Sequence, residues 1–526
     1  MTVLLLQPPA LKPAGPPLGL AVLLGHLRRQ GIAAQALDAN LEAYRYLLQP
    51  DQLAAAAPPA PNTALHRALK HAPRSWQFLA SAAACRSFAR YQSAVQHLNT
   101  ALSVYRGAGS DERLTLGDYQ HGGLSEFVLA DLQRLAAGAV STLFRRYFQH
   151  NLLVTIVAQK PRLIALSINY RHQLLPAFEL AGLLRRALPE VTLVVGGGML
   201  TSWRAELEFA ADALAPFDHL VFGPGEAALV QLARGETSDD FFLEGGDSLA
   251  FHPDFDGLLP TDYLSPEPVL PVTASRGCYW QRCLFCPEAV APTHPYRSCV
   301  PVEVPDLLLK LAEKYRTRHF QFTDNALPLP MLKALAARRA ELAGLAWYGF
   351  VRFEEALGDA ELVEQLAAAG CRMLQLGLES ASQAVLDRLG KGTRIAIAAA
   401  VLCALQRAGI VSYVYIMFGV PDETEQDRLA TLRFLEEHAD AIGFLNVAIM
   451  NLPRQSELAA GRADDGGEGE ARGLYLTGAA EQQRRGAARR FIQQQLLASP
   501  AIRSIVNRTP PLFTSNHAFF FDPRTM

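Results

Sequence analysis

Short apolar stretches alternate with helix-length segments along most of this chain of 526 residues, and this alternation restricts its fold more than any other feature. Strands separated by helices form parallel sheets, because each helix carries the chain back to the edge at which the strands begin. The strand-like ranges are 3–6, 33–40, 163–168, 191–198 and 219–226 in a first series, and 269–278, 319–325, 345–352, 371–380, 411–419 and 443–450 in a second. We therefore predict an α/β protein with two parallel sheets.

The two series predict two domains of different kinds. We expect a doubly wound, Rossmann-like domain over residues 1–245, interrupted by a helical insertion at about 41–155. A turn-rich linker follows at 246–268, and the six strand–helix units of 269–456 predict a complete or partial β/α barrel. Residues 457–526 contain a Gly-rich loop, a basic helix and a tail rich in proline and phenylalanine, which we interpret as a small C-terminal helical region.

Composition argues against several classes of function. With 49 basic and 51 acidic residues, the net charge of −2 gives no electrostatic case for binding nucleic acid or an anionic membrane. The sequence has no uncharged apolar run of about 18 residues, and its start lacks a basic leader, so we expect a cytoplasmic protein. Seven cysteines, an odd number, argue against a disulfide framework and favour metal binding or chemistry for any clustered subset.

Three of the seven cysteines lie in the short stretch "CYWQRCLFC", directly after a predicted strand. They are Cys278, Cys283 and Cys286. A structural zinc site normally has four ligands, and the nearest further candidates, His294 and Cys299, are not at finger spacing. Three thiolates that leave one position open suit a [4Fe–4S] cluster. Structural zinc or a chance grouping is the less favoured interpretation.

At this motif the chain resembles the radical S-adenosylmethionine (SAM) superfamily. Members place three cysteines after the first barrel strand, commonly as C-x3-C-x2-C, with an aromatic residue before the last cysteine. Here the spacing is C-x4-C-x2-C, and the resemblance extends over residues 270–453. Phe285 holds the aromatic position, where the resemblance implies that its ring covers the cluster and the adenine of SAM. The resemblance also implies that the three cysteines bind a [4Fe–4S] cluster, that the remaining iron chelates SAM, and that one electron from the cluster cleaves SAM to a 5′-deoxyadenosyl radical.

Three further segments follow the order of the superfamily's SAM-contacting strands. The resemblance places Asp324 and Asn325 of "FTDN" at the amino group of SAM. It places Glu379 and Ser380 of "GLES" at the ribose and carboxylate. The segment "MFGVPDET" (417–424) resembles the Gly-Pro-Glu-Thr turn that follows the fifth strand.

A doubly wound domain ahead of such a barrel resembles cobalamin-binding domains. The family motif D-x-H-x-x-G is absent from the loop at 7–19, which has no histidine, so the resemblance implies cobalamin without a protein histidine on cobalt. His172 is a less favoured cobalt ligand, and a degenerate Rossmann domain that only packs on the barrel is the alternative. The residues assigned to cobalamin are Ser167, Asn169, Tyr170, Gly196, Gly197, Gly198, Gly225 and Glu226.

Polar residues near the ends of the barrel strands are candidates for contact with a substrate. Arg352 is suited to bidentate pairing with a carboxylate. Tyr413 and Tyr415 alternate onto one face of their strand, so both face the lumen or neither does. We predict these three residues as catalytic. His517 lies in an apolar tail that either folds over the barrel mouth or, as we favour, docks elsewhere as a terminus.

The resemblance implies a cobalamin-dependent radical SAM enzyme. The favoured reaction is methylation of an unactivated carbon in a natural product, a peptide or another small molecule, with a reductant such as flavodoxin or ferredoxin as partner. The alternative uses the same cofactors for a radical reaction without methyl transfer, such as cyclisation, ring rearrangement or transfer of another SAM-derived group. A cofactor-binding regulator without turnover is less favoured.

Overall fold

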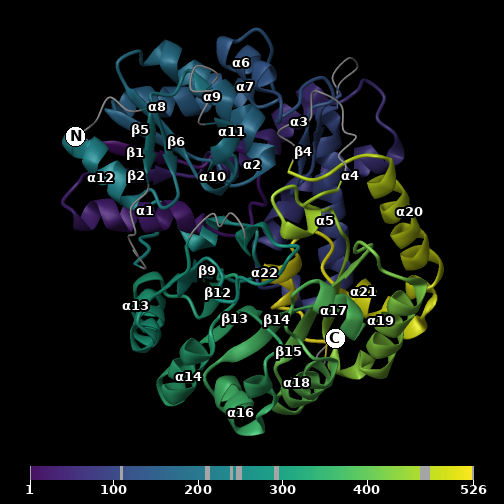
Figure 1. Cartoon of the computed structure of the whole chain (residues 1–526). Helices are drawn as coiled ribbons and strands as arrows, with labels where there is room; N and C mark the ends of the chain where they lie inside the picture. The colour runs from purple at the N-terminus through teal and green to yellow at the C-terminus, as the bar shows by residue number, and fades with distance from the viewer. Residues whose placement is uncertain are drawn as a thin grey trace. The chain divides into compact units, whose positions relative to one another are not determined.

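The computed structural model describes residues 2–106, 111–207, 214–236, 241–244, 252–289, 295–462 and 474–523. The chain forms two compact units, Met1–Pro268 and Val269–Met526 (Figure 1). Each unit contains a parallel sheet, so the predicted α/β fold is confirmed. The first part of the expected linker, His294 and most of the expected Gly-rich loop lie outside the described residues.

The first unit is built on a six-stranded parallel sheet in the order β2-β1-β5-β6-β7-β8. Its strands are β1 (Val3–Leu6), β2 (Ala34–Leu37), β5 (Leu163–Ser167), β6 (Thr192–Gly196), β7 (His219–Phe222) and β8 (Phe242–Glu244). Every residue of β1 is buried, as expected for a central strand covered on both faces. The chain leaves β1 for β2 on one side and returns to β5 on the other, which creates the switch point typical of ligand-binding doubly wound sheets.

Helices cover this sheet and form the predicted insertion. The covering helices are α1 (Leu18–Arg29), α9 (Leu174–Ala187) and α12 (Glu226–Arg234). Between β2 and β5 lie α2 (Ala39–Leu47), α3 (Pro50–Ala56), α4 (Thr63–Leu79), α5 (Phe88–Leu102), α6 (Leu129–Ala137), α7 (Arg145–Tyr147) and α8 (Leu153–Gln159). The insertion also holds an unpredicted two-stranded hairpin, β3 (Arg113–Leu114) and β4 (Tyr119–Gln120).

The second unit contains six parallel strands that pair in chain order, with β9 and β16 at the two edges of the described sheet. They are β9 (Val269–Val272), β12 (His319–Phe322), β13 (Ala346–Val351), β14 (Cys371–Glu379), β15 (Val411–Phe418) and β16 (Phe444–Ile449). Outside them lie α13 (Val304–Tyr315), α14 (Leu329–Ala337), α16 (Ala360–Ala368), α18 (Ile395–Ala408) and α19 (Glu425–Glu437) (Figure 1). This arrangement is the predicted partial β/α barrel, with the carboxyl ends of all strands at one mouth.

The C-terminal region contacts both ends of the barrel, because its first helix lies beside the mouth and the rest docks at the opposite end. It contains α20 (Ala479–Gln494), α21 (Pro500–Arg508) and α22 (Thr514–Ala518). The ring of Phe519 contacts His319, the first residue of β12, and Tyr348 of β13. Arg508 donates hydrogen bonds to the carbonyls of Ile442 and Gly443, just before β16. The tail therefore docks where the strands begin, which decides between the two interpretations of its position.

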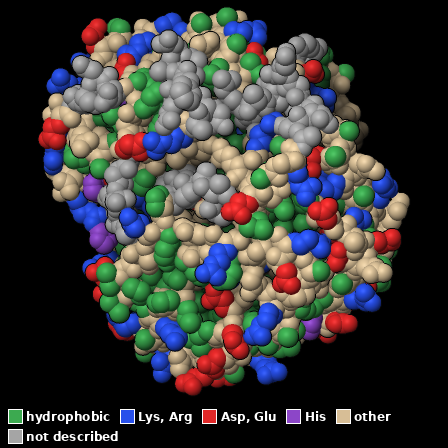
Figure 2. Space-filling model, viewed as in Figure 1, with side chains coloured by type: hydrophobic (Ala, Val, Ile, Leu, Met, Phe, Trp, Pro, Cys, Tyr) green, Lys and Arg blue, Asp and Glu red, His purple; other side chains and the backbone are tan. Residues whose placement is uncertain are grey.

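The surface agrees with the balanced charge of the sequence. Basic and acidic side chains are interspersed over the described part of the face in Figure 2, without a large field of one sign. Among the described residues, no helix combines the length and apolar character needed to cross a membrane.

Candidate active site

The three clustered cysteines lie on the loop that follows β9, at the mouth of the barrel. All three thiols are half-buried, and burial is the main cause that raises the pKa of Cys286 to about 11, with smaller contributions from Cys283 and Cys278. Within the described ranges, no three His, Cys, Asp or Glu side chains are arranged to hold a single metal ion. In a [4Fe–4S] cluster each cysteine binds a different iron.

The extra residue between the first two cysteines is accommodated by a left-handed turn. Gln281 has a φ of 49°, a backbone conformation that residues other than glycine rarely adopt. On one side of it, the Tyr279 hydroxyl donates a 2.6 Å hydrogen bond to Glu354. The indole N–H of Trp280 donates a 3.1 Å hydrogen bond to the carbonyl of Gly390. The longer spacing thus places two aromatic anchors between the first two cysteines.

A glycine-rich loop that follows α17 (Gln383–Arg388) packs against the cysteine loop. Gly390 and Gly392 both have positive φ, and a Cβ on Gly392 would overlap the ring of Trp280. The backbone of Leu284 donates a 2.9 Å hydrogen bond to the carbonyl of Leu389. Only glycine permits this close approach of two loops.

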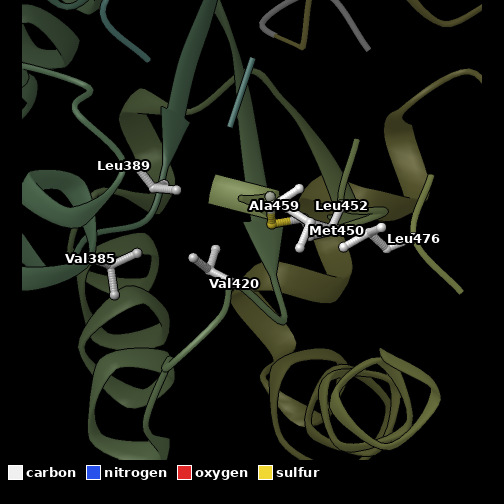
Figure 3. Packing of buried hydrophobic residues seen from close by; sticks show 7 residues of the cluster. All are labelled: Val385, Leu389, Val420, Met450, Leu452, Ala459 and Leu476. Atoms are coloured by element: carbon white, nitrogen blue, oxygen red, sulfur yellow. The ribbon is translucent and has the colours of Figure 1, made fainter. Parts of the chain in front are cut away.

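Phe285 anchors the other half of the cysteine loop. Its ring packs against a buried apolar cluster at the ends of β15 and β16. Figure 3 shows the members of this cluster, Val385, Leu389, Val420, Met450, Leu452, Ala459 and Leu476. The neighbouring carbonyl of Leu284 also accepts a hydrogen bond from Leu458. Phe285 is therefore fixed by packing, and its predicted contact with cofactors remains a prediction.

An ion pair lies next to this loop, at the end of β14. Lys391 Nζ is 2.9 Å from Glu379 Oε1, and the two side chains are only 9% and 15% exposed. Glu379 follows an irregularity in the β14–β15 pairing and has a φ of 66°. A Cβ on Gly377 would lie 2.6 Å from the Glu379 carboxylate, so this glycine leaves room for the pair. Backbone strain of this kind concentrates at functional sites.

Ser380, the neighbour of Glu379, turns into the protein. Its buried hydroxyl lies 3.2 Å from the hydroxyl of Thr431 and accepts a hydrogen bond from the backbone of Ser382. These contacts join the exit of β14 to α19. The hydroxyl of Ser380 is therefore already bonded within the protein, and its direct contact with SAM remains a prediction.

Asp324, at the end of β12, is tied to the exit of β9. Its carboxylate is 2% exposed and accepts hydrogen bonds from the backbone of Ala274 and the hydroxyl of Ser275. Burial is the main cause that raises its pKa to about 6. The carboxylate therefore holds the strand end from which the cysteine loop departs, while the side chain of Asn325 next to it is exposed. Binding of the SAM amino group by either residue remains a prediction.

Arg352, just beyond β13, points at the cysteine loop. Its guanidinium carbon lies 4.1 Å above the ring of Trp280, and Nη2 donates to the carbonyl of Lys391. Nη1 lies 3.9 Å from Cys283 Sγ, within hydrogen-bonding range for sulfur. The positive charges of Lys391 and Arg352 favour a thiolate at Cys283, against the burial that raises its pKa. The predicted pairing of Arg352 with a substrate carboxylate must compete with these contacts.

The two predicted tyrosines share one face of β15, as the alternation required. Tyr413 and Tyr415 stack with ring centroids 4.8 Å apart. The Tyr415 hydroxyl accepts a 2.7 Å hydrogen bond from Gln375 of β14, so it belongs to the inner layer of the barrel. Tyr413 is fully buried against Phe444, near the end that the tail closes. Tyr415 is thus nearer the mouth, and the catalytic role of both remains a prediction.

In the first unit, the predicted cofactor residues gather at the carboxyl edge of β5 and β6. Asn169 donates a 2.9 Å hydrogen bond to the hydroxyl of Ser167 and accepts one of 3.1 Å from the backbone of Gly198. Gly197 has a φ of 113°, and a Cβ there would overlap the carbonyl of Ile168. A Cβ on Gly19 of α1 would lie 3.9 Å from Ser167 Oγ. These contacts build an edge at the switch point that small residues keep open.

The remaining predicted residues of this unit differ in exposure. Tyr170 is 59% exposed, whereas Glu226, the first residue of α12, is buried after Gly225. The His172 ring nitrogen Nδ1 lies 2.9 Å from Asp118 of the insertion, and this contact is the main cause that lowers the pKa of Asp118. His172 therefore has a structural partner already, and the assignments of the others to cobalamin remain predictions.

Comparison with known proteins decides the identity of the second unit. Residues 272–435 match the sequence model of the radical SAM superfamily. This part of the chain is a radical SAM domain. The match begins at the end of β9 and includes the cysteine loop, Glu379 and the Gly-Lys-Gly loop.

Two curated relatives are methyltransferases. An uncharacterized methyltransferase of Pyrococcus horikoshii is 26% identical over 190 residues, 35% of this chain and 40% of the relative. The bacteriochlorophyllide d C-12(1)-methyltransferase of Chlorobaculum tepidum is 25% identical over 198 residues, 35% of this chain and 41% of the relative. The matched part of this chain thus spans about two fifths of the length of each curated relative.

Solved structures show a similar fold over more of the chain. The radical SAM methyltransferase TsrM from Kitasatospora setae, with tryptophan and a SAM analogue bound, has a TM-score of 0.53 at 15% identity, over 87% of this chain and 75% of TsrM. The cobalamin-dependent SAM radical enzyme OxsB, with aqua-cobalamin and SAM bound, has a TM-score of 0.54 at 15% identity, over 98% of this chain and 60% of OxsB. At this identity, the likeness establishes the shared fold.

Sequence reasoning missed parts of the radical SAM domain that the structure brings together. Lys391 was not singled out, although the segment "GKGT" signals a tight loop around a buried lysine. The bond between Tyr279 and Glu354 had no signal in the sequence, because it joins residues 75 positions apart. Cys299 donates its thiol to the carbonyl of Ala274 and so braces the exit of β9.

Proposed function

We propose that this chain is a cobalamin-dependent radical SAM methyltransferase that acts on an unactivated carbon of a small molecule or peptide. The observation that carries the proposal is the set of three half-buried cysteines at the mouth of a radical SAM domain, beside two buried cations. The methyltransferase relatives and the TsrM fold favour methyl transfer. The bound cobalamin of TsrM and OxsB favours the same cofactor in the first unit.

The residues present fit a [4Fe–4S] cluster. Cys278, Cys283 and Cys286 would hold it, and the nearby charges of Arg352 and Lys391 favour thiolates in this half-buried loop. When bound, the cluster supplies the electron that cleaves SAM and starts radical chemistry. The protein's part is to fix the loop through its aromatic anchors and to limit contact with water.

Polar groups next to the cysteine loop are suited to hold SAM. Glu379 carries a carboxylate in a strained backbone position at the mouth, and Asn325 is exposed after β12, the strand that pairs with β9. Lys391 balances the charge of Glu379 in the absence of a ligand. Asp324 holds the exit of β9 in place. We assign direct contact with SAM to Glu379 and Asn325 and a positioning role to Asp324 and Ser380.

In the first unit, the edge formed by Ser167, Asn169 and Gly196–Gly198 is suited to the nucleotide tail of cobalamin. Bound cobalamin would supply a carrier for the methyl group. The loop after β1 contains no histidine, so we propose that no protein histidine of this loop binds cobalt. Tyr170 and the buried Glu226 complete the proposed site.

A second candidate function is compatible with the likeness to OxsB, whose description names cobalamin and SAM radical chemistry without naming a reaction. OxsB is described as a cobalamin-dependent SAM radical enzyme, and its fold matches 98% of this chain. The same cofactors would then serve a radical reaction without methyl transfer. In either case a one-electron reductant, such as flavodoxin or ferredoxin, must reduce the cluster.

Anaerobic reconstitution with iron, sulfide and hydroxocobalamin tests the proposal. We expect about four irons per chain, retention of corrinoid after gel filtration, and release of 5′-deoxyadenosine from SAM in the presence of dithionite. Cys283→Ala should lose the iron, whereas Cys403→Ala, a control on the outer helix α18, should retain it. One zinc without iron would refute the cluster, and loss of all corrinoid would refute the cobalamin site.

SAM with a deuterated methyl group separates the two candidate reactions. Methyl transfer moves the label to cobalamin and then to the product, which gains the mass of a labelled methyl group. A product without the label would favour the second candidate.

A further inference from the structure

Arg352 is held in one position by contacts on three sides. It is 7% exposed, although it lies at the mouth of the barrel rather than in its core. The Trp280 ring covers one face of the guanidinium at 4.1 Å, and the Lys391 carbonyl accepts one of its N–H groups. The carboxylate of Glu354 lies 3.8 Å from Nε. A planar cation fixed in this way loses little further entropy when it donates another hydrogen bond.

The remaining end of the guanidinium is directed at a proposed cluster ligand. Nη1 lies 3.9 Å from Cys283 Sγ, between the largely buried Arg352 and the half-buried cysteine. A hydrogen-bond donor on a ligand sulfur withdraws electron density from an iron–sulfur cluster, and a fixed positive charge stabilises the added electron. Both effects make reduction easier.

We propose that Arg352 is a positioning residue that raises the reduction potential of the cluster through its contact with Cys283. The inference rests on the proposed function, because it requires a cluster on the three cysteines. It differs from the sequence prediction, in which Arg352 pairs with a substrate carboxylate. The guanidinium contacts the cysteine loop through Trp280 and Cys283, both of which precede it by about 70 residues.

The role of Trp280 follows from the same geometry. Its indole is fixed by the hydrogen bond to Gly390, and the exposed Arg282 lies over the same ring at 5.2 Å. Removal of this ring would free one face of the Arg352 guanidinium but leave its bond to Lys391. Trp280 lies in the longer gap between the first two cysteines, so this gap helps to set the position of Arg352.

An anaerobic redox titration of the reconstituted full chain tests the proposal. Dithionite supplies one electron to each [4Fe–4S]²⁺ cluster, and electron paramagnetic resonance measures the fraction in the 1+ state. At the midpoint potential of the wild type, Arg352→Gln should lower the ratio of reduced to oxidised cluster roughly tenfold, equivalent to about 59 mV for one electron. Arg352→Lys and Trp280→Leu should give ratios between those of Arg352→Gln and the wild type.

Arg394→Gln is the matched control, since this arginine follows the loop that contains Lys391 and its side chain is 68% exposed. Its ratio should equal that of the wild type. If Arg352→Gln holds four irons and titrates as the wild type does, the inference is overturned while the proposed function stands. If Arg352→Gln fails to hold iron, wild-type ratios in both Arg352→Lys and Trp280→Leu would overturn it. A wild-type chain without four irons would instead refute the proposed function itself.

Discussion

The hydroxyl of Tyr279 donates a 2.6 Å hydrogen bond to Glu354, and this contact ties the cysteine loop to the chain that follows β13. Glu354 also lies 3.8 Å from Arg352, so the loop, the carboxylate and the guanidinium form one connected network. Burial is the main cause that raises the pKa of Tyr279, followed by its bond to Glu354, so the phenol remains protonated and able to donate.

Tyr279→Phe should loosen the cysteine loop without changing its shape. Loss of a hydrogen bond to a charged acceptor costs about 1.5–3 kcal/mol, reduced here by partial exposure of the carboxylate. We expect faster loss of iron to a chelator, measured by absorbance of the released complex. Tyr475→Phe, at a 40% exposed tyrosine, is the control and should release iron at the wild-type rate. Equal rates in both variants would contradict the anchoring role.

The left-handed turn at Gln281 predicts opposite effects for two substitutions at one position. Gln281→Gly removes the steric cost of a positive φ and should leave the thermal midpoint equal or slightly higher. Gln281→Val places a β-branched side chain in that conformation and should cost about 1–2 kcal/mol. Thermal unfolding of the two variants gives the comparison, and a Val variant as stable as the Gly variant would argue against the turn.

Gly392→Ala should disturb the cysteine loop through its contact with Trp280. The new methyl group would overlap the Trp280 ring and occupy a backbone position with a φ of 70°. Strain and overpacking together should cost about 2–4 kcal/mol. The fluorescence of Trp280 and iron retention report the change. Gly344→Ala is the control, because a Cβ there meets no atom within 4 Å, and it should behave as the wild type.

Lys391→Met should leave the carboxylate of Glu379 without its ion-pair partner. Removal of one partner from a largely buried ion pair costs about 3–5 kcal/mol, less here because both side chains keep some exposure. We expect weaker SAM binding in equilibrium dialysis, because Glu379 loses the charge that positions it. Lys333→Met, at an exposed lysine of α14, serves as control. Unchanged SAM affinity in Lys391→Met would remove Glu379 from the proposed site.

The buried carboxyl of Asp38 predicts a pH dependence in the first unit. Its pKa is raised to about 6, mainly by burial, while hydrogen bonds from Leu41 and Tyr263 oppose the shift and the charge of Glu42 adds to it. The folded state thus binds the proton more tightly than the unfolded state. The associated stability is complete below about pH 4 and is lost as the pH rises through 6, by up to roughly 3 kcal/mol.

Hydrogen exchange of α2, which Asp38 caps, measures this dependence. Protection should fall from pH 4 to pH 6 after correction for intrinsic exchange. Asp38→Asn retains the capping oxygen but not the titration, so its protection should not follow this trend. If the protection of α2 changed equally with pH in both proteins, groups other than Asp38 would be the cause of the dependence.

The sequence was sufficient for the framework of both sheets, because buried parallel strands are short apolar runs with polar ends. The predicted range 3–6 coincides with β1, and Cys371–Glu379 differs from its prediction by one residue. The three-residue strand β8 was missed, since so short a run gives no periodicity. The position of the three cysteines directly after a predicted strand, together with the polar ends of the other strands, located the mouth of the barrel.

The direction of individual side chains could not be obtained in the same way. Arg352 and Asp324 were correctly placed near strand ends, but their partners lie on loops that are distant in sequence. Arg352 follows Trp280 by 72 positions, and no local pattern encodes such a pairing. Strand ends can be predicted from periodicity, whereas their hydrogen bonds depend on how loops pack.

The docked C-terminal tail covers one end of the barrel strands. The rings of Phe519 and Tyr348 pack with centroids 4.7 Å apart where the strands begin, and His517 of the same tail is fully buried. In the described part of the barrel, residues of this tail therefore cover the end at which β12 and β13 begin. If the proposed radical chemistry takes place at the mouth, the aromatic rings of Phe519 and Tyr348 lie at the opposite end of the same strands.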